Sequence, residues 1–340
     1  MTQYFGIDLG TSTIKISYGN EYHLIPSLIG EVNPGWGGGG GDTSFENNLV
    51  IIDGSEKWYV GELARLQSEV KRPLAHNGQM KSAEEVFLAI KAALGLTIKN
   101  IDEDIVIATG VPVATSMEVM KNLSKMLKGN IEIHIENEAT KEKRKFEINI
   151  EKTLVMPEPY GTYYKTLKEK GAEEAVDTVL IDIGHGSTDI LTMYQGRPMR
   201  TASGSLIEAV DTLTNRMAKA LQEKSGQIIK PFDLMMVIKN RRETVMIGGQ
   251  TYSIKGLKDH YSKQIAKVII DEVKRLITTL PPDAFVEFYI ICGGGAYSFG
   301  DVIKEAIIEG KLVSSPENVI IPEDPVLSNA KGFELIANRG

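Results

Sequence analysis

IDLGTSTIKI at residues 7–16 and IDIGHGSTDI at residues 181–190 follow one pattern, about half a chain apart. In each stretch an apolar run contains an aspartate, Asp8 or Asp182, and then reaches a turn of glycine and hydroxyl residues. A second apolar run follows the turn. Such a pattern predicts a strand, a tight turn and a second strand. We interpret the repeat as an internal duplication, and two unrelated hairpins with ordinary turns are the alternative.

The residue types of both turns suit them to phosphate. Backbone N–H groups in a turn of small residues form a concave nest for an anion, and hydroxyls add further donors. The candidate groups are Gly10, Thr11, Ser12, Thr13 and the cation Lys15 in the first turn, and Gly184, Gly186 and Ser187 in the second. A phosphate repels a carboxylate directly, so Asp8 and Asp182 are expected to hold Mg²⁺ through bound water.

The rest of the chain alternates strands and helices. Helices are predicted over residues 83–94, 116–127, 206–223, 259–280, 298–308 and 324–337, with Ser116 as an N-cap. Strands are predicted over residues 4–9, 13–18, 49–53, 58–60, 104–109, 131–135, 146–150, 153–156, 178–183, 189–194 and 285–292. This alternation favours an α/β fold in each half of the chain. The glycine-rich stretch 33–47 predicts a mobile loop.

Composition narrows the class of protein. The 340 residues carry a formal net charge of −7, which argues against broad binding of nucleic acid because that needs a basic face. Cys292 is the one cysteine, so an intramolecular disulfide is impossible and a reducing compartment is expected. The sequence shows neither a signal peptide nor an apolar run long enough to cross a bilayer. We therefore expect a cytoplasmic protein that does not contact membranes.

Five segments, in order, resemble motifs of the actin, heat-shock-chaperone and sugar-kinase superfamily. They are two phosphate motifs at residues 8–15 and 182–189, connecting motifs at residues 156–161 and 329–333, and an adenosine motif at residues 290–296. The chain is most similar to ParM-like plasmid-segregation ATPases and archaeal actin-like filament proteins. This resemblance implies an actin-like (ribonuclease H-like) fold, with two duplicated α/β domains around a nucleotide cleft.

The resemblance also implies roles for individual residues. Glu158 would position or activate the attacking water, with a surface glutamate as the alternative, and Asp189 would help to place the water or the metal. Gly293, Gly294 and Gly295 would let adenosine lie close to the backbone, and the stretch Ser203-Gly204-Ser205 would approach the ribose or phosphates. Base contacts are expected from residues 231–242. His185 departs from the family, which has an acid or a small residue there; it is either a hydrogen-bonded spectator or a phosphate contact.

The expected domains are residues 1–157, residues 158–325, and a C-terminal helix, 326–340, that returns to the first domain. The function implied is an ATPase that uses Mg²⁺ with ATP or GTP and polymerises head to tail into filaments. Its cargo would be a plasmid or other DNA, reached through a centromere-type DNA-binding adaptor protein. A small-molecule kinase of the same fold and a non-polymerising scaffold are the alternatives.

Overall fold

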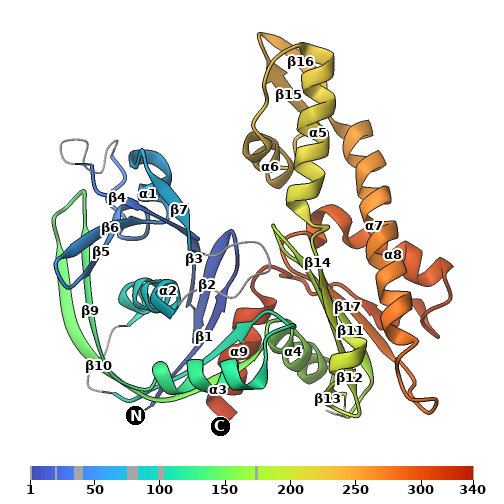
Figure 1. Ribbon diagram of the computed structural model, residues 1–340, viewed down its shortest axis with the longest axis horizontal. Helices are drawn as coiled ribbons and strands as arrows, with labels where there is room; N and C mark the ends of the chain where they lie inside the picture. Colours follow the sequence, from blue (N-terminus) through green and yellow to red (C-terminus); the bar gives the residue numbers. More distant parts are fainter. Residues whose placement is uncertain are drawn as a thin grey trace. The chain divides into compact units, whose positions relative to one another are not determined.

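The computed structural model describes residues 2–19, 21–33, 41–74, 83–98, 103–172 and 175–339. Two compact units make up the chain: unit 1 is Met1–Glu169 with Leu327–Gly340, and unit 2 is Lys170–Val326. Their helices and strands are labelled in Figure 1. Residues 158–169 were expected in the second half, but their contacts group them with unit 1. The reason is that they form a helix that packs on the C-terminal helix of unit 1.

Unit 1 is built on one mixed sheet with the strand order β3-β2-β1-β8-β10-β9-β5-β6-β4-β7. The strands are β1 (Gln3–Leu9), β2 (Thr13–Tyr18), β3 (Glu21–Pro26), β4 (Leu28–Glu31), β5 (Leu49–Asp53), β6 (Glu56–Val60), β7 (Lys71–Pro73), β8 (Ile105–Val111), β9 (Gly129–Asn137) and β10 (Lys143–Pro157). The helices are α1 (Glu62–Gln67), α2 (Ala83–Thr97), α3 (Met117–Met126), α4 (Tyr160–Lys170) and α9 (Ser328–Arg339), with a 3₁₀ turn at Glu46–Asn48. β1 and β10 both run parallel to β8, so these three strands end at the same edge of the sheet.

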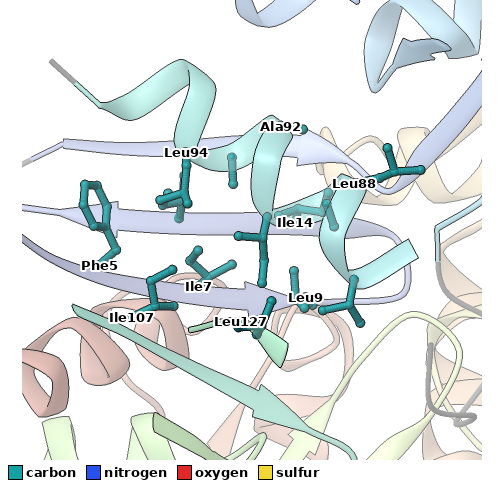
Figure 2. Close-up of a cluster of buried hydrophobic side chains, with 14 of the residues drawn as sticks. Phe5, Ile7, Leu9, Ile14, Leu88, Ala92, Leu94, Ile107 and Leu127 are labelled. Carbon is teal, nitrogen blue, oxygen red and sulfur yellow. The ribbon is translucent and has the colours of Figure 1, made fainter. Parts of the chain in front are cut away.

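Strand β8 is buried along its whole length because helices cover both faces of the sheet. Ile105 and Ile107 face a core that also receives side chains of α2 and α3. Val106 and Ala108 pack on the opposite face, against Phe333 of α9. Figure 2 shows the first of these cores, where side chains from α2 lie over strands β1 and β2. This packing fixes the strand ends that carry the candidate site.

Unit 2 contains a smaller sheet in the order β13-β12-β11-β17-β18, with β14 paired to β12. Its strands are β11 (Thr178–Ile183), β12 (Thr188–Tyr194), β13 (Arg197–Pro198), β14 (Gly204–Leu206), β17 (Phe288–Cys292) and β18 (Val319–Ile320). Its helices are α5 (Val210–Ser225), α6 (Pro231–Lys239), α7 (Lys255–Ile277) and α8 (Ala296–Glu309), with 3₁₀ turns at Arg200–Ala202 and Pro316–Asn318. A separate hairpin, β15 (Thr244–Ile247) with β16 (Gln250–Ser253), lies beside α6 (Figure 1).

Most predicted elements are present, and the differences have physical causes. Ser116 caps α3 by accepting a hydrogen bond from the N–H of Val119, as predicted. The strands predicted at residues 146–150 and 153–156 are one strand, β10, because it pairs with β9 first and with β8 afterwards. The helix predicted from residue 206 begins only at Val210, because Leu206 pairs with Thr188 in the sheet.

Some elements were missing from the sequence analysis. They are the helices α1, α4 and α6, the β15–β16 hairpin, and the strands β3, β4, β7, β13, β14 and β18. The hairpin has a recognisable signal, since Gly248 and Gly249 both have positive φ and form its two-residue turn. The helices α1 and α6 are short, so their periodicity is weak.

The predicted mobile loop, residues 33–47, lies partly outside the described residues, which omit 34–40. In its last part, Asp42 accepts hydrogen bonds from the N–H of Ser44 and the amide of Asn47. The amide of Asn137 on β9 donates to the carbonyl of Thr43. Residues 42–47 are therefore tied to the sheet of unit 1. No helix within the described ranges is long and apolar enough to span a bilayer.

Candidate functional site

The first turn joins β1 to β2 and is held by Ser27. Ser27 Oγ donates to the carbonyl oxygen of Gly10 (2.8 Å), and its N–H donates to the carbonyl oxygen of Ser12 (2.9 Å). A peptide group points its N–H opposite to its carbonyl, so the N–H of Thr11 and that of Thr13 point away from Ser27. A Cβ on Gly10 would lie 2.7 Å from the Thr13 carbonyl, so this turn requires a glycine.

Lys15 and Asp8 lie opposite each other on β2 and β1 and form an ion pair of 2.7 Å between Nζ and Oδ2. Their side chains are 15% and 7% exposed, so the pair is largely out of solvent. From the sequence, Lys15 was expected to contact phosphate and Asp8 was expected to hold the metal through water. An ammonium carries three donors, so contact with Asp8 is compatible with contact to a phosphate.

Glu158 follows the end of β10, at the same edge of the sheet as Asp8. Its N–H donates to the carbonyl of Val111, the last residue of β8 (2.8 Å). A Cβ on Gly110 would lie 2.9 Å from the Glu158 Cα, so the chain passes closely over this glycine. Carboxyl ends of parallel strands are where α/β sheets place their ligands. Unit 1 therefore brings Glu158 and Asp8 to one edge.

The second turn joins β11 to β12 and is held by the start of α5. The carbonyl oxygen of His185 accepts from the N–H of Asp211 (2.8 Å), and that of Gly184 accepts from the N–H of Val210 (3.4 Å). The N–H groups of Gly186 and His185 consequently point away from α5. Gly184 itself donates to the Ser187 carbonyl (2.8 Å) and closes the turn. In both units, therefore, hydrogen bonds to backbone carbonyls hold the turn in place, and the N–H groups of the same peptides point to the opposite side.

Two carboxylates face each other across β11 and β12. Asp182 and Asp189 are directly opposed in the antiparallel register, so their side chains share one face of the sheet. Asp189 is 5% exposed and accepts a hydrogen bond from Ser205 Oγ, while Ser187 Oγ lies 3.5 Å away. Like charges directly opposed repel each other. A cation held through water by these two carboxylates would relieve the repulsion.

Within the described residues no group of three His, Cys, Asp or Glu side chains could hold a metal ion by itself. Magnesium in phosphate sites takes one or two carboxylates and keeps several waters. Asp8 and Asp182 as outer ligands remain a prediction.

The glycine-rich segment after β17 presses against β11. Gly293 has φ +79°, and a Cβ there would lie 2.2 Å from Asp182 Oδ1. A Cβ on Gly295 would lie 2.2 Å from the Ile183 side chain, and the Gly295 N–H donates to the Ile183 carbonyl (2.7 Å). In contrast, a Cβ on Gly294 would have no atom within 4 Å. Packing within the protein therefore accounts for Gly293 and Gly295, whereas Gly294 has open space beside it.

The remaining candidates are less closely tied to these groups. A Cβ on Gly204 would come no nearer than 3.8 Å to Leu276, so nothing in the fold demands glycine there. Its neighbour Ser205, which belongs to the same predicted stretch, donates a hydrogen bond to Asp189, a contact that the sequence did not predict. At the end of α6, Arg241 has φ +53° and a charge that acts on Tyr297 in the first turn of α8. Burial raises the pKa of Tyr297, Asp324 raises it further, and Arg241 lowers it.

The candidate residues thus form two sets, one in each unit. Unit 1 carries Asp8, Gly10, Thr11, Ser12, Thr13, Lys15 and Glu158, and unit 2 carries Asp182, Gly184, His185, Gly186, Ser187, Asp189, Gly204, Gly293, Gly294 and Gly295. Their contribution to binding or catalysis remains a prediction.

Comparison with family models identifies both parts of the chain. Residues 6–161 match the N-terminal domain of actin-like proteins, and residues 180–305 match the C-terminal domain of the archaeal actin homologue MreB-like family. A comparison with curated protein sequences gives no match.

Solved structures share the fold over the whole chain. A non-polymerisable quadruple mutant of pCBH ParM is 22% identical, with 100% of both chains covered and a TM-score of 0.76. Ta0583, an archaeal actin homologue, is 21% identical, with 99% of both chains covered and a TM-score of 0.77; it has also been solved in complex with ADP. A 15-stranded ParM filament from Clostridium botulinum is 22% identical, with 100% of both chains covered and a TM-score of 0.75. These likenesses establish the actin-like fold that the resemblance of the five sequence segments implied.

Proposed function

Because the chain belongs to the actin-like proteins, we propose that it binds and hydrolyses a Mg²⁺–nucleoside triphosphate and polymerises while the nucleotide is bound. The observation that carries this proposal is the construction of the two turns. In each, the carbonyls are tied back, by Ser27 or by the start of α5, and amides are presented on the opposite side. Fixed amides of this kind favour phosphate oxygens without reorganising when the ligand arrives.

The surrounding residues supply the other parts of phosphoryl transfer, which depends mainly on positioning and charge stabilisation. Lys15 supplies a positive charge for the β- and γ-phosphates. Asp182 and Asp8 hold the waters of Mg²⁺, which neutralises charge on the phosphate oxygens. Glu158, fixed by its backbone bond to Val111, orients the attacking water. The open side of Gly294 accepts the nucleoside.

Filament formation would couple the nucleotide state to assembly. A head-to-tail contact whose rotation does not close produces an open filament. The ParM filament of Clostridium botulinum shares the fold and supports this reading. We propose a role in segregating a plasmid or other DNA element in the cytoplasm, through a DNA-binding adaptor protein, since the net charge of −7 is unfavourable for a broad contact with DNA.

Light scattering of the purified protein tests this function directly. Mg²⁺ with ATP, GTP or a non-hydrolysable analogue is added, followed by high-speed pelleting and negative-stain imaging of the pellet. We expect scattering that depends on nucleotide and filaments in the pellet, with the ATP and GTP arms giving the nucleotide preference.

Nucleotide binding without assembly, over a wide range of protein and salt concentrations, would contradict the filament role. The protein would then be tested as a small-molecule kinase with a panel of acceptors, or as a scaffold. Absence of nucleotide binding would contradict the proposed ATPase activity as well.

A further inference from the structure

His185 occupies the centre of the second turn, between Gly184 and Gly186. Its backbone is fixed, because its carbonyl oxygen accepts from the N–H of Asp211 (2.8 Å). Its side chain is half-buried, so the ring lies at the boundary between the protein and solvent. A titratable ring therefore stands beside the amides proposed to hold phosphate.

The imidazole lacks a hydrogen-bonding partner at one nitrogen. Among the described residues, none bonds to its buried Nδ1. A buried polar atom without a partner costs on the order of 1–3 kcal/mol, and no hydrogen bond at this atom holds the ring in place. The ring can thus be reoriented by a ligand that offers it an acceptor.

The electrostatic setting favours the neutral form of the ring in the protein without ligand. Burial lowers the pKa of His185 below 6.5, and the carboxylate of Asp211 raises it by a smaller amount. Within the described part of the chain, Asp211 on α5 is the charged group that acts on the ring. A phosphate adds negative charge at close range, which favours the imidazolium form.

We propose that His185 takes up a proton when nucleotide binds and donates a hydrogen bond to a phosphate oxygen, so that nucleotide affinity rises as pH falls. The step balances: solvent or buffer loses one proton, the imidazole gains it, and no covalent bond to the ligand forms. This inference rests on the proposed nucleotide site. It assigns His185 a direct, charged contact and makes binding sensitive to pH near neutrality.

The direction in which nucleotide affinity changes with pH follows from the linkage between proton binding and nucleotide binding. The pKa of the ring is low without ligand and higher with it, so the bound state holds more protons between the two values. Affinity is therefore lost as pH rises through the pKa of the bound form. One such group changes the dissociation constant by up to about tenfold per pH unit in that window.

Isothermal titration calorimetry of the full chain tests the proposal. Mg²⁺ with a non-hydrolysable triphosphate analogue is titrated near neutral pH in two buffers with different ionisation enthalpies, at protein concentrations that give no light scattering. The dependence of the binding enthalpy on the buffer reports proton uptake. We expect a fraction of one proton, up to about one, in the wild type.

The variant His185→Asn is compared with the wild type, because the side-chain amide of asparagine does not titrate near neutral pH. We expect this variant to bind with no proton uptake beyond what the ligand phosphates contribute. His260→Gln changes an exposed histidine of α7 and should retain the uptake of the wild type. His185→Gln replaces the Asn variant if the latter fails to fold.

The outcomes separate this inference from the function it rests on. Binding with a buffer-independent enthalpy in the wild type overturns proton uptake and leaves the nucleotide site standing. Equal uptake in wild type and His185→Asn assigns the proton to another group and also overturns it. Absence of binding in every buffer contradicts the nucleotide site itself.

Discussion

Gly161 and Gly332 bring helices α4 and α9 of unit 1 into direct backbone contact. A Cβ built on Gly332 would lie 1.8 Å from the carbonyl oxygen of Gly161. One on Gly161 would lie 2.3 Å from the carbonyl oxygen of Asn329. The helices can cross at this distance only if both positions lack side chains. The C-terminal helix is held to unit 1 at this crossing.

Gly332→Ala should lower the free energy of unfolding by about 3 kcal/mol, because overpacking at a backbone contact forces the helices apart. Urea unfolding followed by circular dichroism measures the change. Gly256→Ala is the matched control: it lies in helix α7, and a Cβ there would meet nothing within 4 Å. That variant should gain up to about 1 kcal/mol from helix propensity. Equal stability of Gly332→Ala and wild type would contradict the crossing.

Gly293→Ala and Gly294→Ala should separate folding from binding. Gly293 has φ +79° and touches Asp182, so alanine there should destabilise unit 2 by at least about 1–2 kcal/mol. Gly294 has open space beside it, so alanine should leave thermal unfolding unchanged yet weaken nucleotide binding about tenfold or more. Thermal scans and calorimetric titration measure the two effects. If Gly294→Ala binds nucleotide as wild type does, the nucleoside does not lie against this glycine.

Glu158→Ala should slow nucleotide hydrolysis by about a hundredfold or more, because a residue that orients the nucleophile contributes at this level. Nucleotide binding should change by less than about twofold, since the residue acts on water. Phosphate release and calorimetry give the two quantities. Glu151→Ala, an exposed position on β10, is the control. Unchanged turnover in Glu158→Ala would remove Glu158 from the mechanism.

Ser205→Ala should destabilise the protein by about 1.5–3 kcal/mol at neutral pH, because it removes a hydrogen bond to the buried carboxylate of Asp189. Ser187→Ala should cost less, since its hydroxyl lies 3.5 Å from the same carboxylate, beyond an ordinary hydrogen bond. Denaturant unfolding compares the two variants. A larger loss of stability for Ser187→Ala than for Ser205→Ala would mean that Ser187, and not Ser205, makes the stronger hydrogen bond to Asp189.

Glu334 should make stability depend on pH. Burial raises the pKa of this carboxyl group on α9 above 4.5, although hydrogen bonds from Ser17 and Gly19 lower it. The native state therefore binds the proton more tightly than the unfolded state, and stability falls as pH rises from 4.5 through the native pKa.

Glu334→Gln should remove this loss, because glutamine keeps an acceptor for the Gly19 N–H without a charge. Unfolding free energies of variant and wild type, measured over a pH series, should differ most at neutral pH. Glu147→Gln, at an exposed position on β10, is the control and should follow the wild type. Parallel curves for Glu334→Gln and wild type would contradict the assignment.

Local sequence predicted the strand–turn–strand units well, because their signals are local. β1 pairs with β2, and β11 pairs with β12, across a short turn, so each pair of apolar runs and the turn between them form one continuous stretch of sequence. The N-cap at Ser116 is local for the same reason. Helix α5 was predicted four residues too early, because the pairing of Leu206 with Thr188 is not visible in the periodicity.

The sequence by itself determined that the chain has two related strand–turn–strand units, and their glycine, hydroxyl and aspartate residues predict an anion site at each turn. Tertiary structure alone decided which distant groups meet them: Ser27 on the first turn, α5 on the second, and Ser205 on Asp189. It also decided that Glu158 shares a sheet edge with Asp8. These contacts depend on strand register and on the packing of elements far apart in the chain, which no local pattern of residues specifies.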